Sequence, residues 1–150
     1  MHQNSDLTDL LHALNDEGAR YLIVGGYAFA YHGHIRATRD VDIFVGGDPE
    51  NAARVWRALL AFGAPLTDLR EEDLTRPETF FIMGRPPNQI DLITTIDGVS
   101  FDHAWANRVE STYERTQVYY IGRSDLITNK EAAGRPQDKL DVAYLREHDA

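Results

Sequence analysis

The sequence contains no cysteine, so disulfide bonds, thiolate zinc sites and a cysteine nucleophile are all excluded. It also has no apolar run of the length that a membrane-spanning helix needs. Residues 1–6 lack the basic and then apolar layout of a signal peptide. We therefore expect a protein without a membrane segment that works in the cytoplasm.

Positive charge is scarce as well. Lys and Arg together number 15 against 24 Asp and Glu, which gives a net charge of -9. A nucleic-acid backbone is bound through many Lys and Arg contacts, so broad binding to nucleic acid is not expected. The hydrophobic share of 43% and the length of 150 residues are those of a globular chain with one core. We expect a single domain over residues 1–150.

The order of apolar patterns predicts helices and strands that alternate along the chain. Leucines at helical spacing and local capping residues predict helices, whereas short β-branched and aromatic runs predict strands. For the helix that follows Asp48 and Pro49, the apolar spacing predicts an inner face that includes Leu59 and Leu60. The expected helices cover residues 5–17, 27–33, 49–62, 101–107 and a C-terminal segment of about 123–149. The expected strands cover 20–24, 40–45, 79–83 and 89–96, with a strand or hairpin at 113–121. This interleaving predicts an α/β (α+β) fold with a mixed sheet flanked by helices.

The most informative local feature is the pair Asp40 and Asp42 at the start of an apolar strand. Side chains two residues apart on a strand point to the same side of the sheet. Two carboxylates held side by side repel each other unless a cation lies between them. The pair therefore predicts a site for a divalent metal ion, although an exposed strand face would also tolerate two acids.

A second feature is the pair Gly25 and Gly26, which joins an apolar strand to a helix-compatible stretch starting at Tyr27. Such a turn can present bare backbone N–H groups and a helix N-terminus to phosphate oxygens. Without the acids, a strand-to-helix turn that needs glycine for its conformation alone would be the better explanation. With them, we predict that Gly25, Gly26 and Tyr27 bind the phosphates of a nucleotide.

These motifs together resemble a known superfamily. Gly25-Gly26, thirteen intervening residues and then Asp40-Val-Asp42 with an apolar tail are similar to the nucleotidyltransferases related to DNA polymerase beta. The longer run with Arg36 and Thr38 resembles the AbiEii/AbiGii toxin-like branch. The resemblance implies a nucleotidyltransferase core, Mg2+ (or Mn2+) as cofactor, and a third metal-binding and catalytic carboxylate beside Asp40 and Asp42. In this sequence Asp91 occupies the matching place.

The resemblance also extends to a C-terminal block that contains Lys130 and Arg135. It implies that both residues, together with Arg36 and Thr38, offset the charge of a triphosphate. On the residues alone, Lys130 could equally be a helix-surface lysine and Arg135 a helix-end arginine, and Arg36 could pair with an acid. The relatives often carry an added helical domain, so a partner protein or a second copy is expected to complete the cleft.

The function implied is metal-dependent transfer of NMP from an NTP to a hydroxyl acceptor, with release of pyrophosphate. The acceptor could be a protein, an RNA end or a small molecule, and the branch implies a toxin–antitoxin or phage-defence setting. The alternative is a catalytically inactive domain of the same fold that binds nucleotide or a partner protein. Gly-Gly in place of the more common Gly-Ser keeps that alternative open.

Overall fold

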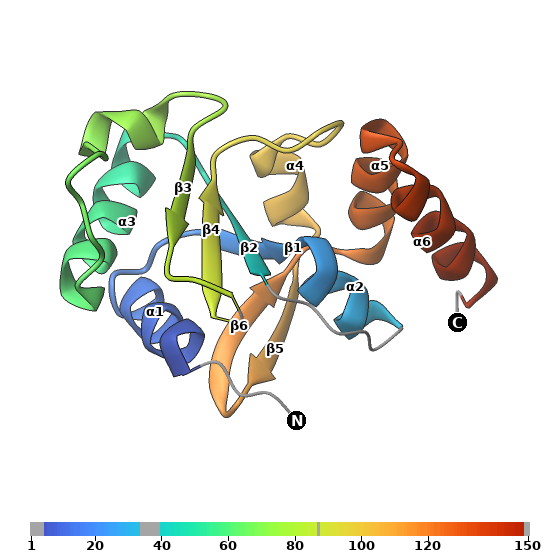
Figure 1. Ribbon diagram of the computed structural model, residues 1–150, viewed down its shortest axis with the longest axis horizontal. Coiled ribbons are helices and arrows are strands. Elements are labelled where there is room, and N and C mark those ends of the chain that lie inside the picture. The colour runs from blue at the N-terminus through green and yellow to red at the C-terminus, as the bar shows by residue number, and fades with distance from the viewer. Residues whose placement is uncertain (1–4, 34–39, 87, 149–150) are drawn as a thin grey trace.

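The computed structural model describes residues 5–33, 40–86 and 88–148, and confirms a mixed α/β fold (Figure 1). A six-stranded sheet forms its centre and helices flank the sheet on both sides. The helices are α1 (Ser5–Asp16), α2 (Gly25–His32), α3 (Pro49–Phe62), the 3-10 helix η1 (Glu71–Thr75), α4 (Phe101–Ala106), α5 (Arg123–Ala133) and α6 (Pro136–Glu147). The strands are β1 (Tyr21–Val24), β2 (Asp40–Val45), β3 (Phe80–Met83), β4 (Gln89–Ile93), β5 (Val109–Tyr113) and β6 (Thr116–Tyr120). No helix in these ranges combines the length and apolar character needed to cross a bilayer.

The sheet has the strand order β3-β4-β2-β1-β6-β5. Strand β2 runs antiparallel to β1 and parallel to β4, and β2 and β1 are the two central strands of the sheet. Strand β3 pairs with β4 and forms the outer strand on that side. The polypeptide thus brings the Gly-Gly turn that follows β1 close to the acids of β2.

Alternation along β2 directs successive side chains to opposite faces of the sheet. On β2, Val41, Ile43 and Val45 are fully buried, and they belong to one core with the leucines of α1 and the apolar face of α3. The intervening Asp40 and Asp42 point to the opposite face and are half-buried. The acids therefore stand on a face that is free of α1 and α3.

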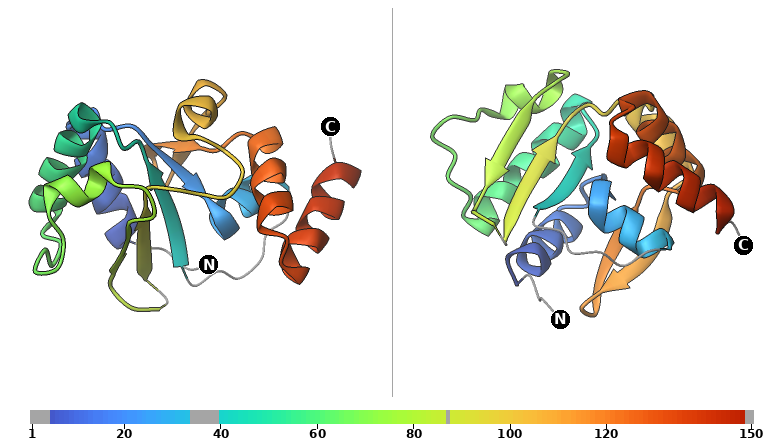
Figure 2. Two further views of the ribbon diagram at one scale, coloured as in Figure 1. Left: turned by 90° about the horizontal axis from the view of Figure 1, so that it is seen from above. Right: turned by 45° about the vertical axis from the view of Figure 1, so that its right-hand side comes forward.

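Helices α2, α5 and α6 lie together on the other side of the molecule from α1 and α3 (Figure 2). Phe29 of α2 meets Tyr144 of α6 edge to face at 5.8 Å between ring centroids. The Tyr144 hydroxyl donates to the carbonyl oxygen of Gly33 at 2.9 Å, and His32 Nε2 lies 2.7 Å from the carbonyl oxygen of Ile121. The C-terminal helices therefore hold the helix that follows the Gly-Gly turn.

Two details differ from the sequence predictions. Residues 113–121 were expected to hold a strand or hairpin, but the hairpin already begins at Val109, and Tyr113 ends its first strand. Its two-residue turn is Glu114-Arg115, both with positive φ, in place of the glycine-containing pairs that mark such turns. Leu60 was predicted on the inner face of α3, yet it is 56% exposed, because Val55, Ala58 and Leu59 fill that face.

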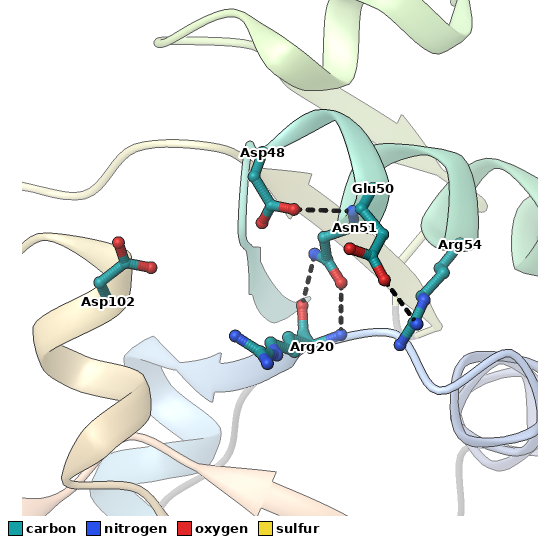
Figure 3. A pocket seen from close by; sticks show the side chains of 6 residues that line it. All are labelled: Arg20, Asp48, Glu50, Asn51, Arg54 and Asp102. Carbon is teal, nitrogen blue, oxygen red and sulfur yellow. Dashed lines mark hydrogen bonds and ion pairs between the residues drawn. The ribbon is translucent and has the colours of Figure 1, made fainter.

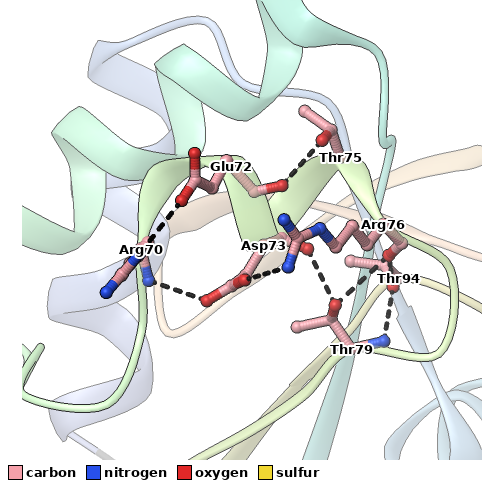
Figure 4. A network of polar contacts seen from close by, with 7 residues as sticks. All are labelled: Arg70, Glu72, Asp73, Thr75, Arg76, Thr79 and Thr94. Atoms are coloured by element: carbon pink, nitrogen blue, oxygen red, sulfur yellow. Dashed lines mark hydrogen bonds and ion pairs between the residues drawn. The ribbon is translucent and has the colours of Figure 1, made fainter.

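A network of polar contacts fixes the segment that leads into β3 (Figure 4). Asp73 accepts from the backbone N–H of Arg70 at 3.0 Å and pairs with the Arg76 guanidinium at 3.2 Å. The N–H of Thr79 donates to Thr94 Oγ1 at 3.0 Å, and that hydroxyl donates to the carbonyl oxygen of Arg76 at 2.7 Å. The beginning of β3 is consequently tied to the end of β4.

Candidate active site

The centre of the site is a row of paired residues across three strands. Asp42 on β2 is paired with Val24 on β1 and with Asp91 on β4. Directly paired residues of neighbouring strands face the same side, so the Asp42 and Asp91 carboxylates share one face. Asp40 lies one step along β2, on that face, and is paired with Gln89. The expected neighbouring strand for Asp91 is confirmed, and the three acids are brought together.

The electrostatics of Asp42 reflect this crowding. Burial is the main cause that raises the pKa of Asp42 to about 7 from its ordinary 3.8. The charge of Asp91, a hydrogen bond between the two carboxyl groups and the charge of Asp40 add to the rise, whereas Arg135 acts in the opposite direction. A bound cation would remove this repulsion.

Gly25 allows the backbone to pass directly beside the carboxylate of Asp42. Its φ is +65°, a conformation that L side chains rarely adopt. A Cβ on Gly25 would also overlap Asp42 Oδ2. Two independent constraints therefore require glycine here: the backbone conformation of the turn, and the closeness of the turn to Asp42.

We expect Gly25→Ala to cost about 2–4 kcal/mol of stability, because left-handed strain and overpacking add at this position. The matched control is Gly63→Ala. Gly63 also has a positive φ, +85°, but nothing lies within 4 Å of the position of a new Cβ. That control should cost only about 1–2 kcal/mol. Urea denaturation of both variants measures the difference, and equal losses would mean that the contact with Asp42 is unimportant.

The donor set suits a hard divalent cation, since all three side chains offer carboxylate oxygens. Asp40 Oδ1 is buried and has no hydrogen-bond partner within the described residues. In the same part of the chain, no three acidic or histidine side chains form a ready-made metal cage. The acids therefore fit Mg2+ or Mn2+ in chemistry, and a cation would have to draw them closer together.

Gln89 is a site residue that the sequence analysis missed. Its Nε2 donates to Asp91 Oδ1 at 2.8 Å, and Asp91 itself is only 5% exposed. The amide thereby fixes the orientation of the third carboxylate. The signal was present in the sequence, because Gln89 shares strand parity with Asp91.

The other predicted phosphate ligands are placed as follows. Gly26 and Tyr27 lie in the first turn of α2, and the Tyr27 ring is 6.2 Å from that of Tyr113. This ring packs against the core, so we expect a phosphate to be bound by the backbone N–H of Tyr27. Arg36 and Thr38 lie outside the described residues.

Lys130 is not the helix-surface lysine that the residues alone allowed. Its Nζ lies 2.8 Å from Asp141 Oδ2 and 3.6 Å from Asp138 Oδ1, and its side chain is 6% exposed. The ammonium group also stands 5.5 Å from the centroid of the Phe29 ring on α2. Lys130 therefore joins α5, α6 and α2 from inside, and reaching a triphosphate would require breaking these ion pairs.

Arg135, in contrast, reaches solvent while staying within electrostatic range of the acids. Its side chain is 76% exposed, and its Nε donates to Asp138 Oδ2 at 2.7 Å. The hydrogen bond that Arg135 donates to Asp138, together with the charge of Asp138, raises the pKa of Arg135, and the charge of Asp42 adds to the rise. Arg135 is thus the described cation best placed to approach an anionic ligand at the acids.

A cavity of about 320 Å³ lies at the other end of the same strands (Figure 3). It is bordered by Arg20, which precedes β1, and by Asp48, which follows β2. The buried amide of Asn51 is fully engaged there, since it bonds the backbone of Arg20 in both directions and the carbonyl oxygen of Gly46. This cavity is distant from the acids along the strands, and Asn51 joins the chain segments around it.

The chain belongs to the family described as nucleotidyltransferase of unknown function (DUF6036), whose model matches residues 4–145. It is similar in fold to the crystal structure of a candidate nucleotidyltransferase from Thermotoga maritima, with a TM-score of 0.62 and 15% sequence identity. That similarity covers 95% of this chain and 91% of the other. No curated protein matches.

Proposed function

We propose that this protein is a metal-dependent nucleotidyltransferase that moves NMP from an NTP to a hydroxyl acceptor. The observation that supports this most directly is the row Val24–Asp42–Asp91, which places two carboxylates next to the turn at Gly25. A phosphate-binding turn and a divalent-cation site have to be neighbours for chemistry on a triphosphate.

In this proposal the position of each residue determines its role. The N–H groups at the start of α2 hold phosphate oxygens, and Arg135 offsets negative charge from the side of α6. Asp40, Asp42 and Asp91 bind Mg2+ or Mn2+, which supplies Lewis-acid activation of the phosphate and of the attacking hydroxyl. Lys130 is a positioning residue that keeps α5 and α6 against α2. The resemblance to the AbiEii/AbiGii toxin-like branch extends the proposal to a toxin–antitoxin or phage-defence role in the cytoplasm.

Incubation with α-labelled NTPs, Mg2+ or Mn2+ and cell extract tests the proposal. We expect label to be transferred to an acceptor by the wild-type protein and not by Asp40→Ala. Binding of NTP without transfer in either metal would instead support the inactive, nucleotide-binding alternative. Mass spectrometry of the labelled product identifies the acceptor.

A further inference from the structure

The outer strand β3 carries two apolar side chains in line with the site. Ile82 is paired with Asp91, which is itself paired with Asp42, and Phe80 occupies the next matching place opposite Ile93. Paired residues share a face, so Phe80 and Ile82 stand on the same face as the acids. Neighbouring strands lie about 4.8 Å apart, which puts the backbone of Ile82 about 10 Å from that of Asp42.

Both side chains are open to solvent. Phe80 is 59% exposed and Ile82 is 51% exposed, whereas the alternate residue Met83 is buried in the core. The right-hand view of Figure 2 looks onto β3, β4 and β2, with α3 behind them and α5 and α6 to one side. Large apolar side chains that are exposed together beside a polar site are typical of a binding surface.

The backbone of β3 is also available for pairing. It is the outermost strand of the described sheet, so alternate N–H and C=O groups point away from β4. Proteins usually protect such an edge with charged residues or proline, but residues 80–83 contain neither. The contacts of Thr79 and Thr94 hold the start of the strand in place (Figure 4). The edge is therefore ordered before any partner arrives.

We propose that β3 is the docking edge for the acceptor, and that the acceptor is an extended polypeptide that adds to the sheet as a further strand. The proposal rests on the nucleotidyltransferase function given above. Strand addition takes affinity from main-chain hydrogen bonds and specificity from alternate side chains, and β3 offers both. An RNA acceptor fits poorly, because residues 80–83 carry no basic group and the chain has a net charge of -9.

The two substrates then approach the acids from opposite sides, the NTP over Gly25 and the polypeptide over Ile82. The acceptor hydroxyl oxygen forms a bond to the α-phosphorus, and the bond from that phosphorus to the bridging oxygen of the β-phosphate breaks. Pyrophosphate leaves with the electron pair, and the hydroxyl proton passes to solvent water. An added strand would stand about 10 Å from β4, which carries Asp91, and about 14 Å from β2, which carries Asp40 and Asp42. A long side chain such as tyrosine therefore reaches toward the acids better than serine does.

The experiment compares two peptide libraries and a random-sequence RNA oligonucleotide as acceptors of label from α-labelled NTPs. One library places Tyr, Ser or Thr within alternating Val and Thr, and the other places them among Gly and Glu. The variant is Ile82→Lys, because a charge blocks pairing at a sheet edge. The matched control is Leu60→Lys, which changes a similarly exposed apolar residue on α3. Binding of Mg-ATP, Mg-GTP, Mg-CTP and Mg-UTP is measured for all three proteins.

We expect wild type and Leu60→Lys to label the Val/Thr library at least tenfold better than the Gly/Glu library, with tyrosine preferred. Ile82→Lys should lose at least tenfold of that transfer while its nucleotide affinities stay within twofold. Transfer to RNA that Ile82→Lys leaves unchanged would overturn the docking proposal but keep the nucleotidyltransferase function. Absence of transfer to the peptides, to RNA and to the acceptors in cell extract would overturn both. A wild-type dimer that Ile82→Lys converts to a monomer would show that a second copy occupies β3, which also overturns the proposal.

Discussion

Asp42→Asn should abolish nucleotide transfer and, in the metal-free protein, increase stability. The loss of transfer should be on the order of 1,000-fold or more, because metal activation lowers the barrier by several kcal/mol. The gain in stability follows from the pKa of Asp42, which lies at about 7 in the folded protein and at its ordinary 3.8 when unfolded. Above pH 7 the wild type has to keep this carboxylate ionised beside Asp91 and Asp40, whereas the variant does not.

The pH dependence of that gain has a definite sign. Between about pH 4 and pH 7 the folded wild type binds more protons than the unfolded chain, so its stability falls as the pH rises through this window. Urea denaturation in EDTA should show Asp42→Asn more stable than wild type by about 1–3 kcal/mol at pH 8. The difference should shrink toward zero near pH 4, and added Mg2+ should stabilise only the wild type. A large loss of stability at pH 8 would instead identify Asp42 as a structural residue.

Lys130→Met should destabilise the protein by about 3–5 kcal/mol, because removing one partner of a buried ion pair leaves the opposite charge buried without compensation. Lys130 lies between Asp138 and Asp141, which are each 2% exposed. Methionine keeps much of the side-chain volume but supplies no charge. A domain of this size has a free energy of unfolding of about 5–15 kcal/mol, so the expected loss is a large part of its stability. Urea denaturation at pH 7 measures the loss.

The chain provides its own control, since Lys139 is its other lysine and is exposed on α6. Lys139→Met should change stability by no more than about 0.5 kcal/mol. Adding Asp141→Leu to Lys130→Met should recover part of the lost stability, because the second substitution removes the buried carboxylate whose counter-ion was lost. If Lys130→Met and Lys139→Met behaved alike, Lys130 would have no role in holding the helices.

The sequence predicted the parts of the site that depend on short-range periodicity. Parity along one strand is sufficient to put Asp40 and Asp42 on one face, and Gly25-Gly26 marks a strand-to-helix turn. Pairing between strands is a long-range property, and Asp91 was placed next to Asp42 only because the chain resembles a known superfamily. The register in the structure supplies that link directly.

What the sequence could not predict depends on which neighbour covers each side chain. Lys130 looks like a surface residue from its helix alone, because its burial comes from acids eight and eleven residues farther along and from Phe29 on α2. The Glu114-Arg115 turn was missed because it has positive φ without glycine. Leu60 lies at the margin of the apolar stripe of α3, and only packing decides on which side of the margin it falls.

The contacts of α6 with α2 have a consequence for biosynthesis. Tyr144 supports Phe29 and the carbonyl oxygen of Gly33, so a helix near the end of the chain steadies a turn made in its first fifth. On a ribosome, the glycine turn and the first acids emerge long before that support exists. A nascent chain therefore lacks this support until α6 has been synthesised and has folded onto α2.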